Sequence, residues 1–199
     1  MKLINKYKSP NYNSRKFHKI KFIIIHYTAL ANCNEAITHL CKADNKVSCH
    51  YLISQNGQIY SLVDEKKRAW HAGFSYWDSI TDINSCSIGI EIDYSNNKNN
   101  RKFTNKIINS LKNLLYYLKK KYKIDEKNIL GHSDIAPYRK IDPGKNFPWK
   151  NLNLSKLVFM PKNINKNVLS NINNWFKSHG FKSKKTISIF ILMYIGYDI

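Results

Sequence analysis

Residues 21–27 read KFIIIHY, a short apolar run rich in β-branched residues that ends on a histidine and a tyrosine. Such a run is typical of a buried strand. A second run of this kind, SIGIEI at 87–92, ends next to a glutamate, and a shorter one, NILGH at 128–132, ends on a histidine. The sequence therefore predicts a buried sheet with polar side chains at the ends of its strands.

Further elements flank these strands. HYLIS at 50–54 and QIYSLV at 58–63 read as two strands of a hairpin, because the Asn56-Gly57 pair between them favours a tight turn. Helices are predicted over residues 34–43 and from Thr104, a residue suited to capping, to about Tyr122. The fold class predicted from these patterns is α/β, with a mixed central β-sheet flanked by helices and a short helical tail.

The order of segments along the chain suggests four parts. Residues 1–20 are polar and read as an irregular arm, and residues 21–150 hold the sheet domain. Within that domain, residues 133–149 show no periodicity and form a proline-containing loop. Residues 151–166 look like a linker, and residues 167–199 contain two helical patterns that form the tail.

The chain is strongly basic, with a net charge of +20 from 33 basic and 13 acidic residues. A basic surface favours polyanions, and nucleic acid is one such partner. The 25 asparagines beside many lysines and isoleucines support another explanation, a bias towards AT-rich codons. Because no nucleic-acid-binding motif is recognisable, no specific nucleic acid is expected as a partner.

The cysteines and the first residues bear on the compartment. None of the four cysteines lies in a C-x-x-C pair, which favours free thiols in a reducing compartment, with one or two disulfides as the alternative: Cys33, Cys41, Cys49 and Cys86. Residues 1–20 lack the apolar core of an export signal, and no stretch reaches the length of a membrane span. The cytoplasm is therefore expected, with the periplasm as the alternative.

Two histidines and an aspartate form a candidate metal site. His26 and His132 each close a predicted strand, and Asp142 follows ten residues after the second histidine. Catalytic zinc is commonly held by three protein ligands of these types, with a fourth position left open. The spacing alone is weak support, because either histidine taken singly could equally be an ordinary core or surface residue.

The sequence around these residues resembles the AmpD-type N-acetylmuramoyl-L-alanine amidases, the amidase-2 family. The matching strings are HYTA at 26–29, SCHYLIS at 48–54, AWHAG at 69–73, SIGIEI at 87–92 and GHSDIAPYRKIDPGKNFPW at 131–149. The resemblance implies a peptidoglycan recognition protein-like fold and one Zn²⁺ per chain held by His26, His132 and Asp142. It also implies hydrolysis of the amide bond between N-acetylmuramic acid and L-alanine in peptidoglycan or muropeptides.

The resemblance assigns catalytic roles to two further residues. Glu91 is expected to act as general base and then general acid, and Lys140 to stabilise the oxyanion of the tetrahedral intermediate. Without the resemblance, Glu91 would equally fit a salt bridge and Lys140 a solvated surface position. Relatives of phage-lysozyme type carry a catalytic tyrosine where this chain has Cys49 and a cysteine ligand where it has Asp142, so both positions favour the AmpD-like branch.

Five residues are candidates for substrate binding: Tyr27, His50, Arg68, Trp70 and His71. Trp70 and His71 would line the cleft for sugar and peptide, although a core or rim aromatic is an alternative. Arg68 could bind a stem-peptide carboxylate through its planar guanidinium group. His50 also fits a structural place behind the metal ligands.

The sequence leaves several points open. A peptidoglycan sensor that does not cut its ligand is the main rival function, and a nucleic-acid-binding protein is a weaker one. The tail at 167–199 loosely resembles the start of a helical peptidoglycan-binding module. The substrate is either intact wall or small anhydro-muropeptides, and a monomer is expected.

Overall fold

The computed structural model describes residues 1–16, 19–95, 102–160 and Asn174. Its strands are β1 (Leu3–Ile4), β2 (Tyr12–Ser14), β3 (Phe22–Tyr27), β4 (Tyr51–Ile53), β5 (Ile59–Ser61), β6 (Lys67–Ala69), β7 (Ser87–Ile92) and β8 (Ile129–Gly131). Its α-helices are α1 (Cys33–Cys41), α2 (Ile83–Cys86), α3 (Asn105–Tyr122), α4 (His132–Ile135) and α5 (Trp149–Leu154). Two 3-10 turns are η1 (Ala43–Asn45) and η2 (Glu126–Asn128). Apart from Asn174, the predicted tail at 167–199 lies outside the described residues.

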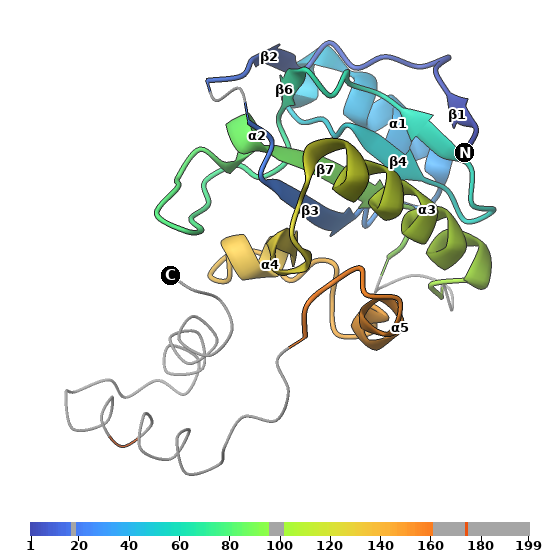
Figure 1. Ribbon diagram of the computed structural model, residues 1–199. Coiled ribbons are helices and arrows are strands. Elements are labelled where there is room, and N and C mark those ends of the chain that lie inside the picture. The colour runs from blue at the N-terminus through green and yellow to red at the C-terminus, as the bar shows by residue number, and fades with distance from the viewer. Residues whose placement is uncertain (17–18, 96–101, 161–173, 175–199) are drawn as a thin grey trace.

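A mixed sheet forms the centre of the described part of the chain (Figure 1). Six described strands lie in the order β1-β5-β4-β7-β3-β8, and β2 and β6 form a separate antiparallel ribbon. The β4–β5 pair is antiparallel, whereas β1–β5, β4–β7, β7–β3 and β3–β8 are parallel. This arrangement confirms the predicted mixed α/β fold and its central strands.

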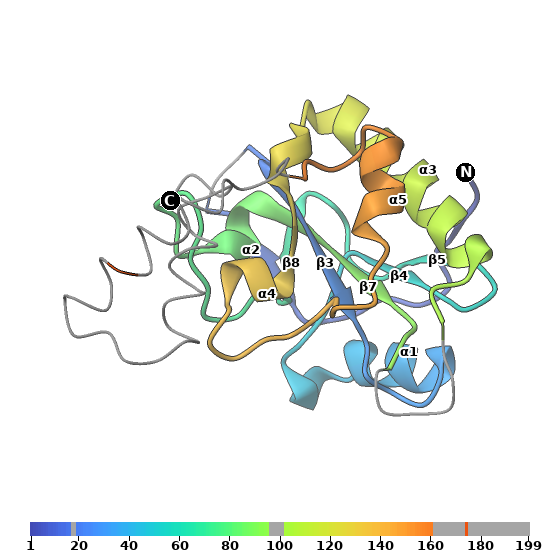
Figure 2. The same ribbon diagram turned by 90° about the horizontal axis from the view of Figure 1, so that it is seen from below.

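Successive side chains of β3 point to opposite faces of the sheet and pack in two different layers. Ile23 and Ile25 pack in the same cluster as the buried face of α3, whereas Phe22 and Ile24 pack with residues of α2 and α4. Figure 2 shows α3 and α5 on one side of the sheet and α1 on the other. Because successive side chains of a strand point to opposite faces, His26 continues the side of Phe22 and Ile24, away from α3.

The same alternation explains the pattern of β7. Its three isoleucines, at 88, 90 and 92, belong to the α3 layer. The intervening positions, Ser87, Gly89 and Glu91, therefore lie on the opposite face. The register pairs Glu91 directly with His26 on the neighbouring strand. Small or polar residues in an otherwise apolar strand thus mark the face on which the functional groups lie.

The long helix α3 begins and ends as its sequence predicts. The Thr104 hydroxyl caps it by accepting a hydrogen bond from the backbone N–H of Ile107. Lysines in its last turn complement the negative end of the helix dipole. Its apolar face is fully buried against the sheet: Ile107, Ile108, Leu111, Leu114, Leu115 and Leu118. No helix among the described residues combines the length and apolar character needed to cross a membrane.

The hairpin β4–β5 is confirmed, with its turn at the Asn-Gly pair. Gly57 has a φ of 81°, which L side chains rarely adopt, and its N–H donates to the carbonyl of Ser54. A Cβ at this position would lie 2.8 Å from the carbonyl oxygen of Lys106 in α3. Glycine is therefore needed here both for the turn and for the close approach of the helix.

The N-terminal segment differs from the irregular arm predicted for residues 1–20. β1 adds a parallel strand beside β5, and β2 pairs with β6. After β2, the partly buried Arg15 guanidinium donates hydrogen bonds to the carbonyls of Glu65, Asn84 and Ser87. Because these carbonyls belong to the loop before β6, to α2 and to β7, the N-terminal segment is part of the sheet domain.

The predicted linker at 151–166 is wrong for its first ten residues. Instead of leaving the domain, residues 149–154 form α5, and the chain then returns to the core. Leu152, Leu157 and Val158 are fully buried in the cluster that also contains the face of α3. The buried apolar residues here lie on one short helix and on the bend that follows it. Their spacing is therefore too irregular to be recognised as a helical or strand pattern in the sequence.

The burial of residues 157 and 158 predicts that alanine substitution of two nearby leucines has different effects on the stability of the protein. Leu157→Ala should lower the free energy of unfolding by about 2–5 kcal/mol, because it removes buried side-chain volume. Leu154→Ala is the matched control, since Leu154 is 85 % exposed and should change stability by less than about 0.5 kcal/mol. Urea unfolding of both variants measures the difference. Equal, small effects would restore the linker interpretation.

Candidate functional site

His26 reaches the site from the end of β3. The strand passes through the core, and its side-chain alternation turns this histidine away from α3. The imidazole is buried, at 1 % exposure. Burial, together with the neighbouring His132, lowers the pKa of His26 to about 4. The ring is therefore neutral at physiological pH, which is the form that can bind a metal ion.

His132 and Asp142 come from the segment that follows β8. His132 is the first residue of the short helix α4, and Asp142 lies at the far end of the irregular loop. The N–H of Ser133 donates to the carbonyl of Asp142 over 2.8 Å, which fixes the end of the loop beside the start of α4. Two ligands ten residues apart are thereby brought to the end of β3.

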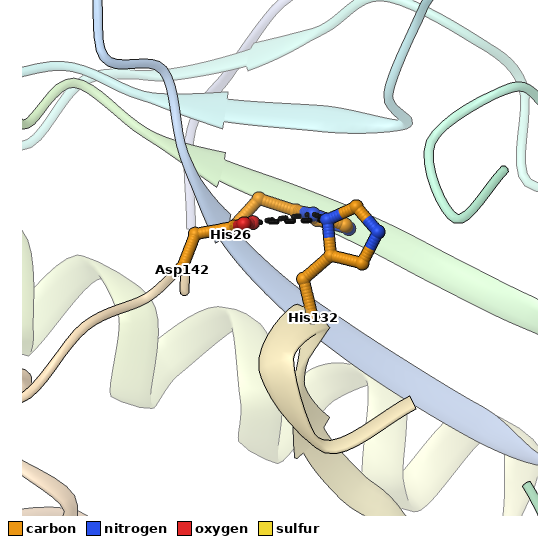
Figure 3. A group of neighbouring side chains, drawn as sticks. All are labelled: His26, His132 and Asp142. Atoms are coloured by element: carbon orange, nitrogen blue, oxygen red, sulfur yellow. Dashed lines mark hydrogen bonds and ion pairs between the residues drawn. The ribbon is translucent and has the colours of Figure 1, made fainter. Parts of the chain in front are cut away.

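The three side chains converge on one point (Figure 3). The Nδ1 atoms of His26 and His132 are 2.9 Å apart, and each lies 3.0 Å from Oδ2 of Asp142. Ligands about 2 Å from a tetrahedral zinc ion would be separated by about 3.3 Å, so only a small outward shift is required. Two imidazole nitrogens and one carboxylate oxygen, all buried, are a donor set consistent with a metal site.

Glu91 lies beside this group on the neighbouring strand. Its Oε2 atom is buried and has no hydrogen-bond partner among the described residues. Burial, and then the negative charge of Asp142, raise the pKa of Glu91 to about 8. A buried carboxylate oxygen without a partner is unfavourable in a purely structural position, so its place beside the ligand set indicates a functional group.

A cleft of about 380 Å³ opens over the four residues. Its further lining includes two predicted substrate-binding residues, Tyr27 and His71, and the predicted catalytic residue Lys140. The remaining lining residues are Thr28, Ala29, Leu30, His39, Leu40, Val47, Arg139 and Ile141. The structure therefore brings the predicted metal ligands, Glu91 and Lys140 together around one cavity.

His50 is not among the described residues that line the cleft, and it takes the structural place that was the alternative to substrate binding. It is fully buried, and its Nδ1 atom accepts a hydrogen bond from the backbone N–H of Gly89. Burial, together with the positive charge of Arg15, lowers the pKa of this ring to about 3. Its Nε2 atom lies 2.9 Å from the guanidinium of Arg15 and 3.1 Å from the carbonyl of Lys67, so both ring nitrogens are engaged inside the domain.

Arg68 and Trp70 also lie outside the cleft, near the β2–β6 ribbon. Arg68 forms an ion pair with Asp82 at 2.8 Å, and the indole N–H of Trp70 donates to the side chain of Asn13. Both side chains are therefore engaged with other parts of the chain. A carboxylate partner within the protein replaces the stem-peptide carboxylate that was predicted for Arg68.

Arg139 is a cleft residue that sequence reasoning did not single out. Its guanidinium donates to the carbonyls of Ala72 and Phe74, which holds the loop after β6 against the loop that carries Asp142. In the sequence it stands beside Lys140 among many basic residues, so charge alone could not distinguish it. Only the spatial arrangement of the two loops identifies its role.

Comparison with known proteins agrees with this geometry. A family model described as N-acetylmuramoyl-L-alanine amidase matches residues 16–145. The chain is 38 % identical over 152 residues to the N-acetylmuramoyl-L-alanine amidase AmiD of Escherichia coli, covering 68 % of this chain and 53 % of AmiD. It is 43 % identical over 106 residues to the 1,6-anhydro-N-acetylmuramyl-L-alanine amidase AmpD of Haemophilus influenzae, covering 53 % and 56 %. The chain thus spans little more than half the length of these curated relatives.

Solved structures show the same fold. Escherichia coli AmiD, in complex with anhydro-N-acetylmuramic acid-L-Ala-D-gamma-Glu-L-Lys, matches with a TM-score of 0.68 and 30 % identity, covering 98 % of this chain and 76 % of that one. AmpDh3 of Pseudomonas aeruginosa, in complex with an anhydromuramic pentapeptide, matches with a TM-score of 0.70 and 28 % identity, covering 98 % and 80 %. Together with the buried ligand set, these matches show that the chain belongs to the amidase-2 family of N-acetylmuramoyl-L-alanine amidases.

Proposed function

We propose that this chain hydrolyses the amide bond between N-acetylmuramic acid and L-alanine, with Zn²⁺ held by His26, His132 and Asp142. The observation that carries the proposal is the position of Glu91, whose unpartnered Oε2 lies buried beside a complete His/His/Asp ligand set. A sensor that only binds peptidoglycan would have no use for this costly carboxylate. Family membership supplies the substrate class.

Each residue of the site has a chemical task in this reaction. Zn²⁺, when bound, supplies a Lewis acid that polarises the scissile carbonyl and acidifies water. Glu91, whose ionised form the positive charge of a bound ion would favour, accepts a proton from the attacking water and returns it to the leaving amine of L-alanine. Lys140, in the wall of the cleft, stabilises the negative charge that develops on the carbonyl oxygen. No side chain of the protein needs to act as a nucleophile.

We further propose that small anhydro-muropeptides are better substrates than intact wall. Two related structures, AmiD and AmpDh3, hold anhydromuramyl peptides, which supports this substrate class. A basic chain would also attract the carboxylates of the stem peptide. This preference agrees with the cytoplasm as the expected location, where such fragments are the available substrate.

Parallel digestion tests both the reaction and the preference. The zinc-loaded protein is incubated with purified sacculi and with an anhydro-muropeptide, and the products are identified by mass spectrometry. We expect release of free peptide beginning with L-alanine, at a higher rate from the small substrate. Faster release from sacculi would make the enzyme a wall-remodelling amidase, and cleavage at another bond would disprove the proposed reaction.

A further inference from the structure

The His71 ring lies between the metal ligand His26 and a buried serine of β7. His71 Nδ1 is 3.1 Å from His26 Nε2, and His71 Nε2 is 3.2 Å from the hydroxyl oxygen of Ser87. All three side chains are buried. Because the bonding atoms face one another in the interior, the direction of each hydrogen bond follows from what the neighbouring groups can donate or accept.

The directions can be assigned from the serine. The Ser87 hydroxyl lies 2.6 Å from the carbonyl oxygen of Ile83. A carbonyl can only accept, so the single hydroxyl hydrogen is committed to this bond. The Ser87 oxygen must then accept from His71, whose proton therefore resides on Nε2. A neutral imidazole that donates from Nε2 presents a lone pair at Nδ1, and this lone pair accepts from the Nε2–H of His26.

The result is that His26 carries its hydrogen on Nε2 and a lone pair on Nδ1, the atom that faces His132 and Asp142. The other tautomer would direct a hydrogen at the metal position. His132 reaches the same state separately, because its Nε2 lies 3.0 Å from the carbonyl of Ala72, which again can only accept. Both histidines therefore present unprotonated Nδ1 atoms to one point.

The surroundings of His71 hold its ring and its backbone in place. A Cβ at Gly89 would lie 2.4 Å from the Cγ atom of His71, so only glycine leaves space for this ring against β7. The side-chain oxygen of Asn84 accepts hydrogen bonds from the N–H groups of both His71 and Ala72. Asn84 of α2, together with Ser87 and Gly89 of β7, thus fixes the position of His71.

We propose that His71 is a positioning residue that, with Ser87, holds His26 in the tautomer that binds the metal. Loss of the Ser87 oxygen would allow His71 to move its proton to Nδ1, and this would force the hydrogen of His26 onto the metal-facing nitrogen. Partners of this kind typically contribute 10–100-fold to metal affinity. The proposal rests on the metal site of the proposed function.

Ser87→Ala tests the proposal, with Ser85→Ala as the matched control. Ser85 is equally buried and lies only two residues away, but its hydroxyl bonds to Asp82 rather than to His71. Zinc affinity is measured by competition with a chelator. We expect a loss of about 10–100-fold for Ser87→Ala and little change for Ser85→Ala. If the wild type binds zinc and Ser87→Ala binds it equally tightly, the proposal is overturned.

Two substitutions of His71 distinguish a role in positioning His26 from a role in packing alone. His71→Asn keeps an oxygen acceptor near the place of Nδ1, whereas His71→Leu fills the space without one. If His71 acts through its acceptor, zinc affinity should fall in the leucine variant and be largely retained in the asparagine variant. Equal loss in both, with equal melting temperatures of the metal-free proteins, would contradict a positioning role.

The tautomer itself can be read in the metal-free protein from the ¹⁵N chemical shifts of the histidine rings. We expect His26 to be protonated on Nε2 in the wild type, and to shift towards Nδ1 protonation in Ser87→Ala. Protonation of wild-type His26 on Nδ1 would overturn the proposal. This measurement needs neither zinc nor substrate, so it remains decisive even if the wild-type protein fails to bind zinc and the proposed function is wrong.

Discussion

Removal of the metal should abolish hydrolysis completely, and addition of about one equivalent of Zn²⁺ per chain should restore it. The reason is chemical: the proposed hydrolysis requires an activated water, and Thr28, which lines the cleft, directs its hydroxyl to the carbonyl of Tyr94. His26→Ala should lose zinc and activity together, because the two remaining ligands cannot hold the ion in a three-ligand site. Elemental analysis and the rate of muropeptide cleavage measure the two quantities.

His39→Ala provides the control for zinc content. His39 also lines the cleft, but its ring bonds to the side chain of Asn45 on the surface. This variant should retain the full amount of zinc, whatever its effect on substrate binding. A wild-type preparation that is fully active without any divalent metal would show that the proposed chemistry is wrong.

Glu91→Gln should reduce turnover by about 10²–10⁴, the usual contribution of a general acid–base group. The amide has the shape of the carboxylate but cannot accept a proton from water. Since burial already disfavours the charged form of Glu91, the neutral glutamine should not destabilise the fold. We therefore expect normal zinc content and an unchanged or slightly higher melting temperature, together with a large loss of rate.

A carboxylate far from the site provides the comparison for this variant. Glu126 lies in η2 and pairs with Lys119 on the surface, so Glu126→Gln should leave turnover unchanged. Near-wild-type turnover in Glu91→Gln would move the proton transfer to another group. His71 would then be the first alternative, because it is the remaining buried imidazole in the wall of the cleft.

The parts of the fold that the sequence predicts are those with strong local patterns. The strand at 21–27, the hairpin around Gly57 and the helix after Thr104 all follow from periodicity, turn preference and capping. By contrast, β1, β2 and β6 lie in polar stretches without the apolar runs or the Asn-Gly turn that mark the equally short β4 and β5. Their pairing depends on contacts between distant segments, such as those of Arg15.

The candidate site shows the same division. The residue types of the metal ligands and their places at strand ends were visible in the sequence, but their grouping came from a family resemblance rather than from spacing. The sequence could not decide which candidates face the cleft. His50 and His71 are both histidines near predicted strands, yet one lies inside the domain and the other in the cleft wall. Their contacts in the folded chain separate them: the His71 ring lies next to His26, whereas His50 bonds to the N–H of Gly89 and to Arg15.

The parallel pairing of β3 with β8 has a consequence for the unfolding equilibrium. His26 and His132 are 106 positions apart in the chain, and they meet only when these two strands are joined. The unfolded chain therefore has no comparable site, and any ion bound here acts as a reversible cross-link between the end of β3 and the segment that follows β8. At a free concentration 1,000 times its dissociation constant, such an ion would add about 4 kcal/mol to the free energy of unfolding. Changes in metal supply would then alter the stability of the folded protein as well as its activity.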